Sequence, residues 1–476
     1  MTKIICSLLI FCSISFQLLA QQVEQPVLTV ESRTMVSTGD QVPFWLQMNQ
    51  LGIYDDADPF QQLFLLNFKG GPQTDFEDHF QLSYGLNIVG RLSDHATFRP
   101  NEYWARLHYK NWYIHLGSKS EPVFANGLSL TNGNMFLSNN ARPLPRVGFG
   151  VNNFKIAKEG WFNHFSFDFD YNEYFLLDDR YVDDAHLHHK RLDINYAFAS
   201  HWTVSAGFDH WVFWGGTVPA TGNRDAFEMP GFEDYFRYIT GRVGSSDAPE
   251  TDQLNVAGNQ LGLYLASLEY ENEDNYLKLY WQHLWEDRSG MQFENAPDGL
   301  WGIYWQQKRP HQLLESVVLE YANTRDQSGP HHKFHPDPDR PDYETGEGED
   351  NYFTHGTYKS GFVSYNRMMG IPLFIPVIED GISKGFNNTR FWAIHNGMDG
   401  WISKTVSWKT LLTYSKHYGR YGSEYIAPKE FVSAAVQIGY MLPTIPMQCA
   451  LKLAYDDGDI LQSNFGAELQ FTYTLK

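Results

Sequence analysis

The last residues of the chain alternate between apolar and polar side chains without a break. One face of this segment carries Phe465, Ala467, Leu469, Phe471, Tyr473 and Leu475, and the other carries Gly466, Glu468, Gln470, Thr472, Thr474 and Lys476. A period of two over this length predicts a β-strand with one apolar and one polar face. An aromatic strand of this kind in the last position is typical of outer-membrane β-barrels. Such barrels usually stop on an aromatic residue, whereas here Lys476 follows Leu475.

The first twenty residues predict an export signal. Lys3 precedes an apolar stretch over residues 4–19, and the small residue Ala20 follows it. This is the pattern of a secretory signal peptide over residues 1–20. Serine and glutamine interrupt the stretch, which argues against a membrane anchor. Beyond it no run of about 18 apolar residues offers a transmembrane helix, so residues 21–476 are expected to form one exported domain.

Alternation of the same kind recurs along most of the chain. It is found at residues 80–91, 102–110, 112–116, 164–172, 191–198, 202–209, 261–270, 276–285, 300–306, 314–321, 406–414, 432–440 and 447–456. A lysine or arginine on a lipid-facing surface costs about 2–4 kcal/mol at mid-bilayer, and Arg91, Arg106, Arg191 and Lys278 all fall on the polar faces. We therefore predict an all-β fold, a transmembrane antiparallel β-barrel with lipid outside and the polar faces toward its lumen.

The composition is consistent with a membrane barrel. Aromatic residues make up 16% of the chain, which suits the girdles of Trp, Tyr and Phe at the two membrane interfaces. The net charge of -20 argues against a nucleic-acid partner, which requires a basic surface. The alternative is one or more soluble β-sandwiches, but the alternation runs almost end to end without a clear linker. A soluble barrel of this many strands would have an interior too wide for side chains to fill.

Two segments interrupt the strand pattern. Between Pro230 and Val243 the apolar residues follow helical spacing, and Pro230 suits a helix start. A short inserted helix is therefore predicted near residues 230–243. Residues 323–350 are rich in proline, aspartate and glutamate, which predicts a long polar loop on the extracellular side.

Sequence signatures of catalysis are missing. The chain contains no GxSxG, HExxH, GxxxxGK or GxGxxG pattern, so we predict that it is not an enzyme, has no catalytic residues and holds no cofactor. Two groups of histidines could suggest a metal site: His186, His188 and His189, and His331, His332 and His335. Because no cysteine or regular ligand spacing accompanies them, they are better explained as loop and lumen residues, and no metal site is predicted.

Aromatic and polar residues near predicted strand ends suggest sugar binding. The candidates are Trp285, Asp287, Asp298, Trp301, Tyr352 and His355. Aromatic rings bind the apolar C–H surface of a sugar, while polar side chains bind its hydroxyl groups. The alternative for each aromatic residue is a place in an interfacial girdle. The alternative for the polar residues is packing inside the lumen.

Several short motifs, in order along the chain, resemble the capsule-assembly Wzi family in its Bacteroidetes-type form. They are PFWL at 43–46, SNNARPLP at 138–145, DQLN at 252–255 with GNQLG at 258–262, DGLWG at 298–302, and DNYF at 350–353 with GIP at 370–372. Together these motifs span about residues 43–374. Gln260 departs from the pattern, because many relatives have histidine at that position.

The resemblance implies an outer-membrane barrel of about 18 strands with short inserted helices. It also implies a lectin-like role, in which the protein binds capsular or other surface polysaccharide and attaches it to the cell surface. The expected partners are that polysaccharide, outer-membrane lipid and the barrel-assembly machinery, with the protein acting as a monomer and without nucleic acid. The barrel pattern alone supports an alternative function, a porin or substrate channel.

Overall fold

The computed structural model describes residues 26–72, 79–222, 225–249, 252–253, 256–330, 332–336 and 344–475. The predicted signal peptide, residues 1–20, lies outside the described residues. So do residues 331 and 337–343 of the predicted polar loop.

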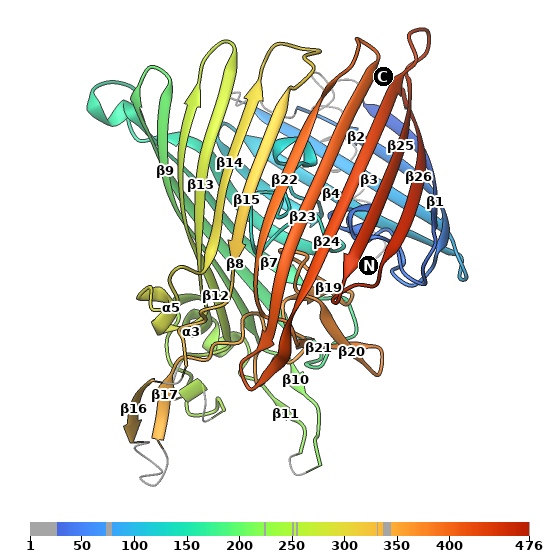
Figure 1. Ribbon diagram of the computed structural model, residues 1–476. Helices are drawn as coiled ribbons and strands as arrows, with labels where there is room; N and C mark the ends of the chain where they lie inside the picture. The colour runs from blue at the N-terminus through green and yellow to red at the C-terminus, as the bar shows by residue number, and fades with distance from the viewer. Residues whose placement is uncertain are drawn as a thin grey trace, which may run out of the picture.

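Eighteen antiparallel strands close into one barrel (Figure 1). In barrel order they are β1 (Val27–Ser37), β2 (Phe60–Gly70), β3 (Phe80–Leu92), β4 (Thr97–Tyr109), β5 (Trp112–Ser118), β6 (Pro145–Lys155), β7 (Phe165–Phe175), β8 (His186–Ala199), β9 (Trp202–Trp214), β12 (Asn259–Glu271), β13 (Asn275–Trp285), β14 (Gly299–Gln307), β15 (Ser316–Asn323), β22 (Arg390–Trp401), β23 (Val406–Arg420), β24 (Ser423–Met441), β25 (Met447–Gly458) and β26 (Asn464–Leu475). Pairing of β1 with both β2 and β26 closes the ring. The prediction of a barrel of about 18 strands is confirmed.

Short elements occupy the connections between these strands. Four hairpins are β10–β11 (Thr217–Val218, Phe227–Glu228), β16–β17 (His332–Pro336, Glu344–Glu347), β18–β19 (Val363–Ser364, Arg367–Met368) and β20–β21 (Pro376–Glu379, Ile382–Phe386). The helices are α2 (Phe44–Gln47), α3 (Tyr235–Thr240), α5 (Arg288–Met291) and the 3-10 turns η1 (Ala125–Gly127), η2 (Trp161–His164) and η3 (Phe232–Asp234). Among the residues described, no helix is long and apolar enough to cross a membrane.

The last strand has the two faces that its sequence predicts. Leu469 and Phe471 are 41% and 38% exposed on the outer face of β26, whereas Glu468 is 5% exposed and points into the lumen. Inside the barrel, Arg91 of β3 pairs with Asp55, and Lys278 of β13 pairs with a glutamate of β12. These two pairs of charged residues therefore point away from the lipid-facing surface.

The long connections gather at one end of the barrel. They comprise residues 38–59, 119–144, 215–258 and 324–389, whereas the opposite end has short turns such as 110–111 and 200–201. Outer-membrane barrels have short periplasmic turns and longer extracellular loops. In Figure 1 the extracellular end is therefore at the bottom, and the C-terminal end of β26 lies with the short turns at the top.

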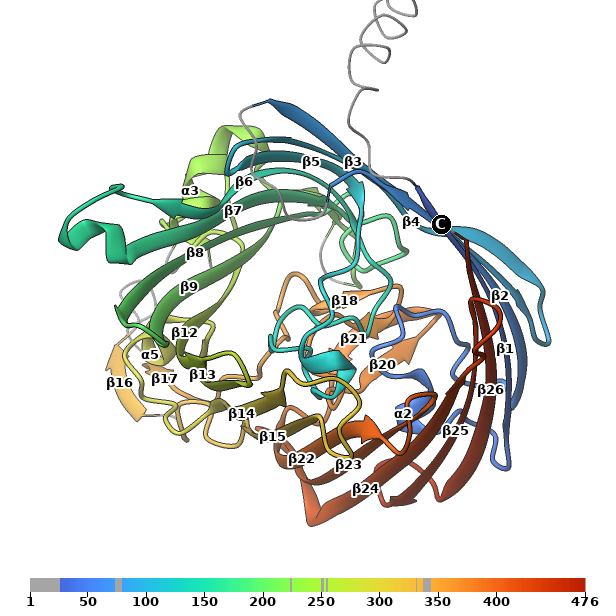
Figure 2. The same cartoon turned by 90° about the horizontal axis from the view of Figure 1, so that it is seen from above.

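Three connections fold back into the lumen, and we call them the luminal plug: residues 38–59, 119–144 and 351–389. Figure 2 shows α2, from the first of them, inside the ring of strands. Its Trp45 donates a hydrogen bond to Thr413 Oγ1 of β23 at 3.1 Å. Buried apolar side chains of the plug and of the surrounding strands form one continuous core.

Aromatic rings hold the plug segments together. The ring of Phe353 lies 5.3 Å from Phe136, 5.7 Å from Phe362 and 4.7 Å from Phe374. These contacts join residues 119–144 to residues 351–389. The lumen is therefore filled largely by an apolar core, which is unlike the water-filled interior of a porin.

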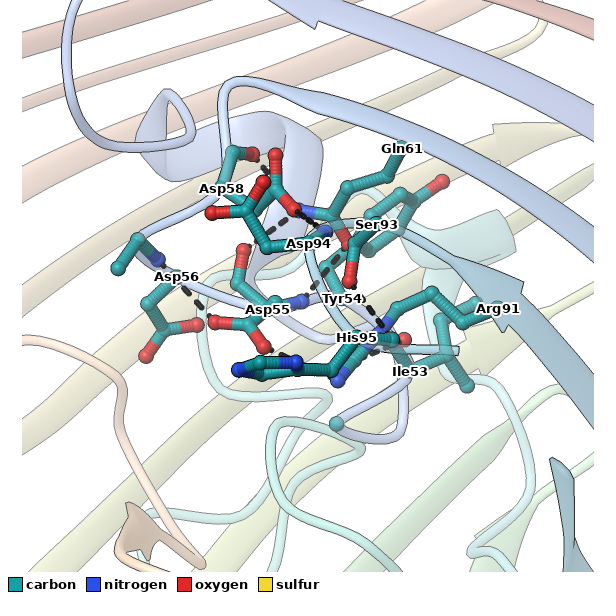
Figure 3. Close-up of polar contacts among 12 residues, drawn as sticks. Ile53, Tyr54, Asp55, Asp56, Asp58, Gln61, Arg91, Ser93, Asp94 and His95 are labelled. Carbon is teal, nitrogen blue, oxygen red and sulfur yellow. Dashed lines mark hydrogen bonds and ion pairs between the residues drawn. The ribbon is translucent and has the colours of Figure 1, made fainter. Parts of the chain in front are cut away.

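Polar contacts join the first plug segment to the barrel wall (Figure 3). Arg91 of β3 donates to Asp55 Oδ2 at 3.0 Å. Gln61 of β2 accepts a hydrogen bond from the backbone N–H of Asp55 and donates to the carbonyl of Asp58. The Asp58 carboxylate accepts from the backbone N–H of Asp94, in the turn between β3 and β4, at 2.6 Å. The segment is thus fixed where it returns to the wall.

Candidate functional site

A pocket of about 870 Å³ lies at the extracellular rim of the barrel. Its lining comes from the rim ends of β8, β9, β12 and β13, from α3 and α5, and from the crossing segment 348–355. Three of the predicted sugar-binding residues, Trp285, Asp287 and His355, line it. We call this site the rim pocket.

The alternation of β9 places the rim pocket on the outer side of the wall. Trp211 and Phe213 point into the lumen, where their rings lie 5.5 and 5.9 Å from Phe362 of the plug. Their neighbours His210 and Val212 point outward, because successive side chains of a strand alternate between faces. His210 lines the rim pocket, so the pocket opens away from the lumen.

Two short helices cover this outer face. Val212 and Trp214 form a buried cluster with α3 that is separate from the luminal core, and Figure 2 shows α3 outside the ring of strands. The segment after α5 lies beside it on the wall, because the Phe293 ring contacts His283 at 4.5 Å and Tyr264 at 5.4 Å. The rim pocket lies between these two helices.

Trp285 supplies the aromatic surface of the rim pocket. Its indole is stacked with His210, with 5.6 Å between ring centroids and 18° between planes. It also lies over Gly262, where an added methyl group would come within 1.9 Å of the indole, so this position requires glycine. Trp285 is only 4% exposed, and its Nε1–H has no hydrogen-bond partner among the described residues.

Two further polar atoms of the rim pocket are also buried without a partner. Gln260 donates from Nε2 to the carbonyls of Tyr238 and Ala257, so its Oε1 accepts from His210 Nε2 at 2.7 Å. In the neutral ring, His210 Nδ1 is then an acceptor, and it has no partner in the described part of the chain. Asn259 Nδ2 is likewise unpaired there, but Asn259 lies opposite the inward Phe213, so its side chain is on the lumen side of the wall. The outward side of the pocket therefore offers one unused donor, Trp285 Nε1, and one unused acceptor, His210 Nδ1.

Asp298 and Tyr352 lie beneath the rim pocket, in a buried network. The Asp298 carboxylate accepts four hydrogen bonds: from Asn323 Nδ2, from the backbone N–H groups of Asp326 and Gln327, and from the Tyr352 hydroxyl. Burial raises the pKa of Asp298 to about 7, although the N–H donors oppose this shift. The network holds the crossing segment 348–355 against the ends of β14 and β15.

Asp298→Asn is expected to release the crossing segment. An amide has one acceptor oxygen, so its NH₂ group would face two of the four donors, at a cost of about 1–3 kcal/mol for each buried group left unpaired. Limited proteolysis and hydrogen exchange should show faster opening of residues 324–330 and 348–355. Asp287→Asn is the matched control, because one oxygen suffices to cap α5 at the Gly290 N–H. Equal protection of the segment in Asp298→Asn and wild type would contradict this role.

His355 and Asp287 contribute differently to the rim pocket. The Nδ1 atom of His355 accepts hydrogen bonds from the backbone N–H groups of Thr357 and Tyr358. Burial lowers the pKa of His355 to about 4, so the ring is neutral near pH 7 and carries its hydrogen on Nε2. Asp287 caps α5 through Oδ1 and accepts there from Ser289 as well. Asp287 as a whole is exposed at the lining of the pocket.

Comparison with known proteins identifies the family. The family model described as capsule assembly protein Wzi matches residues 49–374, which is more than half of the chain. The chain belongs to this family. This Wzi-family barrel is thus an outer-membrane protein, as its sequence predicts.

Solved structures are similar to this Wzi-family barrel in fold. A structure of Wzi from Escherichia coli, described as a carbohydrate-binding β-barrel involved in group 1 capsule assembly, is 14% identical with a TM-score of 0.55, covering 97% of this chain and 86% of that one. Pseudomonas aeruginosa OprD is 10% identical with a TM-score of 0.44, covering 96% and 95%. OpdQ from the same organism is 9% identical with a TM-score of 0.45, covering 95% and 99%. No curated protein matches the chain.

Trp301 lies apart from the rim pocket of the Wzi-family barrel. It lies on the outer face of β14, where its ring is 5.8 Å from that of Tyr321 and where Ile303 is exposed. Trp301 is therefore on the lipid-facing surface, which agrees with the alternative that it belongs to an aromatic girdle of the membrane interface. Tyr352 is fully buried and can contact no sugar directly. The six candidates therefore separate into three pocket residues, two residues of the network and one on the lipid-facing surface.

The sequence analysis did not single out His210 or Asn259. A signal for His210 is present in the chain: along β9 the outward residues change from Val204 and Phe208 to His210, from apolar to polar. Asn259 lies within the GNQLG motif at 258–262, but its side chain is on the inward face of β12, opposite Phe213.

The first histidine group does not converge. His188 points outward and its Nδ1 lies 2.5 Å from Glu173 Oε1, whereas His189 points inward, with its Nε2 2.9 Å from Asp209 Oδ1. Within the described residues, no group of three or more His, Cys, Asp or Glu side chains has an arrangement that could hold a metal ion. The side chains of His331, His332 and His335 lie outside the described part of the structure.

Proposed function

We propose that this Wzi-family barrel binds surface or capsular polysaccharide in the rim pocket and retains the polymer without altering it. The family assignment supports this function, and the Escherichia coli structure with the same fold is described as carbohydrate-binding. The absence of catalytic motifs in the sequence supports binding without catalysis.

The chemistry of the rim pocket is the observation on which this proposal rests. The indole of Trp285 offers an apolar surface, while Trp285 Nε1 and His210 Nδ1 have no partner among the described residues. A sugar hydroxyl both donates and accepts hydrogen bonds, so it can satisfy this mixture. A buried polar atom without a partner costs about 1–3 kcal/mol, and a bound sugar would recover part of that cost.

Retention of a long polymer needs only weak individual contacts. When many copies of the protein bind one polymer, each further contact is effectively intramolecular, and the overall affinity rises without new contacts. We propose that each barrel acts as a monomer; the ring of strands closes within one chain, so no second chain is needed to complete the barrel. Insertion by the barrel-assembly machinery is part of the same proposal.

Purified protein should bind the released surface polysaccharide of the producing cells through Trp285. Trp285→Ala removes the aromatic surface and the unused donor Nε1. The lost hydrogen bond is expected to weaken binding by about two- to tenfold. Gly262→Ala is a complementary variant, because it displaces the indole without removing it. Binding is measured by biolayer interferometry on detergent-solubilised protein.

Trp112→Ala is the matched control, because Trp112 is an exposed tryptophan on β5 far from the rim. Deletion of the gene should also move polysaccharide from the cell-bound fraction to the medium while total synthesis is unchanged. A cell-bound fraction equal to that of wild type would contradict the attachment function. Loss of binding in Trp112→Ala as large as in Trp285→Ala would contradict the assignment to the rim pocket.

A further inference from the structure

An apolar groove lies on the outer wall of the barrel, on strands that also form the rim pocket. It has a volume of about 640 Å³ and is lined by side chains of β9, β12, β13, β14 and β15. Ala266, Leu268, Leu279, Trp301 and Leu319 are among its lining residues. We call it the outer groove. Its place on the lipid-facing surface makes a hydrocarbon chain its natural occupant.

Aromatic side chains in contact with one another connect the outer groove to the rim pocket. Trp281 lines the groove, and its ring lies 6.4 Å from that of Phe293. Phe293 lies 5.4 Å from Tyr264, and Tyr264 lies 6.1 Å from Trp285 of the rim pocket. The two sites therefore share one strip of the outer wall.

The rim pocket lies where the outer wall changes from apolar to polar. On β8 the outward residues pass from Ile194 and Leu192, both exposed, to Lys190, which lines the pocket. On β12 they pass from Ala266 through Tyr264 to Gln260. Aromatic residues mark the interface between hydrocarbon and headgroups in such barrels. The pocket is thus at the level of the outer-leaflet headgroups.

We propose that the rim pocket and the outer groove form one site for a glycolipid of the outer leaflet. An acyl chain occupies the groove, and the sugars next to the lipid anchor occupy the pocket. The inference rests on the proposed function for its sugar chemistry, and it specifies that the bound glycan is lipid-anchored. The barrel then holds a glycan at its membrane end instead of along a free polymer.

Location and hydrogen bonding together favour this ligand. A pocket on the outer side of the wall, at the level of the headgroups, faces the sugar-bearing lipids beside the barrel. A free polymer instead approaches from the extracellular solution. A phosphate accepts hydrogen bonds and would leave the acceptor His210 Nδ1 unused. Sugar hydroxyls can satisfy that acceptor as well as the donor Trp285 Nε1. A phospholipid could occupy the groove, and the ammonium of phosphatidylethanolamine could donate to His210 Nδ1, but its headgroup has no sugar C–H face to lie against the indole of Trp285.

Native mass spectrometry of the full-length protein in detergent tests the proposal with three probes. They are rough lipopolysaccharide, which carries acyl chains and a short core oligosaccharide, the same oligosaccharide after release from its lipid, and phosphatidylethanolamine. The intact glycolipid should bind at least about tenfold more tightly than the released oligosaccharide. Burial of only about two methylene groups of the acyl chain accounts for a difference in affinity of this size. The intact glycolipid should also outcompete phosphatidylethanolamine.

Ala266→Phe separates the two halves of the site. The added ring fills the outer groove with apolar atoms on a lipid-facing surface, so the barrel should still fold. Binding of the intact glycolipid should weaken by about tenfold, because about two methylene groups of its acyl chain would no longer be buried in the groove. Binding of the released oligosaccharide should not change. Ala434→Phe on β24, an outward alanine on another part of the wall, is the control and should bind the glycolipid as wild type does.

Equal affinity for the intact glycolipid and the released oligosaccharide would overturn the inference and leave the proposed function standing. Tight binding of phosphatidylethanolamine, equal to that of the glycolipid, would also overturn it, because the groove would then be an ordinary lipid contact. Failure of both sugar-bearing probes to bind would overturn the inference alone, whereas the proposed function would also fall if the released surface polysaccharide bound Trp285→Ala as well as it bound the wild type.

Discussion

Leu469→Lys is expected to prevent most of the protein from assembling in the membrane. Leu469 lies on the outer face of β26, paired with Leu451 of β25 and Thr34 of β1, near the middle of the strand. A lysine on the lipid-facing surface costs about 2–4 kcal/mol at the bilayer midplane. Because β26 closes the ring with β1, the cost falls on the final pairing of the barrel. The folded, heat-modifiable fraction in outer-membrane preparations should drop several-fold.

Gln470→Lys is the matched control for this change. Gln470 is the next residue of the same strand and points into the lumen, where its Nε2 contacts Thr472 Oγ1 at 3.1 Å. The same side chain at this position stays out of the lipid, so assembly should remain close to wild type. If the two variants assembled equally well, the assignment of the two faces would be wrong.

Alternation of apolar and polar residues could predict only those strands whose inward side chains are polar. In β3, β7 and β26 the inward face is polar and the outward face apolar, and all three strands were recognised. β2 was missed, because its inward Leu63 and Leu65 pack on the plug while its outward Phe64 and Leu66 face lipid. With both faces apolar, the period of two disappears. A strand whose inward residues pack against the apolar plug therefore lacks the alternation by which a strand is recognised in the sequence.

The candidate site was predictable only in part, for a related reason. Trp285 and Asp287 follow directly from the end of β13, and His355 was selected by its residue type and position near the rim. Their meeting in one pocket depends on α3 and α5 folding back over the outside of the wall. Alternation within a strand gives no information on that packing, and it does not show that Asp298 and Tyr352 contact each other instead of a ligand.

Glu320 connects the plug to the barrel wall. A plug fixed in this way would block the lumen, so the plug is the feature that distinguishes the attachment function from the channel alternative. Glu320 of β15 is buried, and its carboxylate accepts hydrogen bonds from Ser129 Oγ and the backbone N–H of Leu130, each at 2.7 Å, and from the Tyr280 hydroxyl at 2.7 Å. On the neighbouring strand β22, His395 is directly paired with Glu320, and its Nε2 lies 2.6 Å from the carbonyl of Leu128. Residues 128–130 are therefore fixed to the wall formed by β15 and β22.

Wild-type protein in planar bilayers should accordingly show little conductance. Replacement of residues 123–140 by a short Gly-Ser linker should raise the conductance by roughly tenfold or more, because it removes one of the three plug segments from a barrel whose 18 strands enclose room for an aqueous channel. The linker can join β5 to β6 because these strands are neighbours. Glu320→Gln keeps the plug but removes part of its anchor, and it should give brief openings.

Deletion of residues 158–160 is the control for the plug replacement, since these exposed residues lie in the turn between β6 and β7 at the periplasmic end. That variant should remain as closed as wild type. High conductance of the wild type, unchanged when the plug segment is replaced, would mean that solutes bypass the plug, and it would favour the channel. Closed wild type with an open plug variant would leave binding at the rim as the function of the barrel, because a lumen closed by its own apolar core cannot serve as a route for solutes.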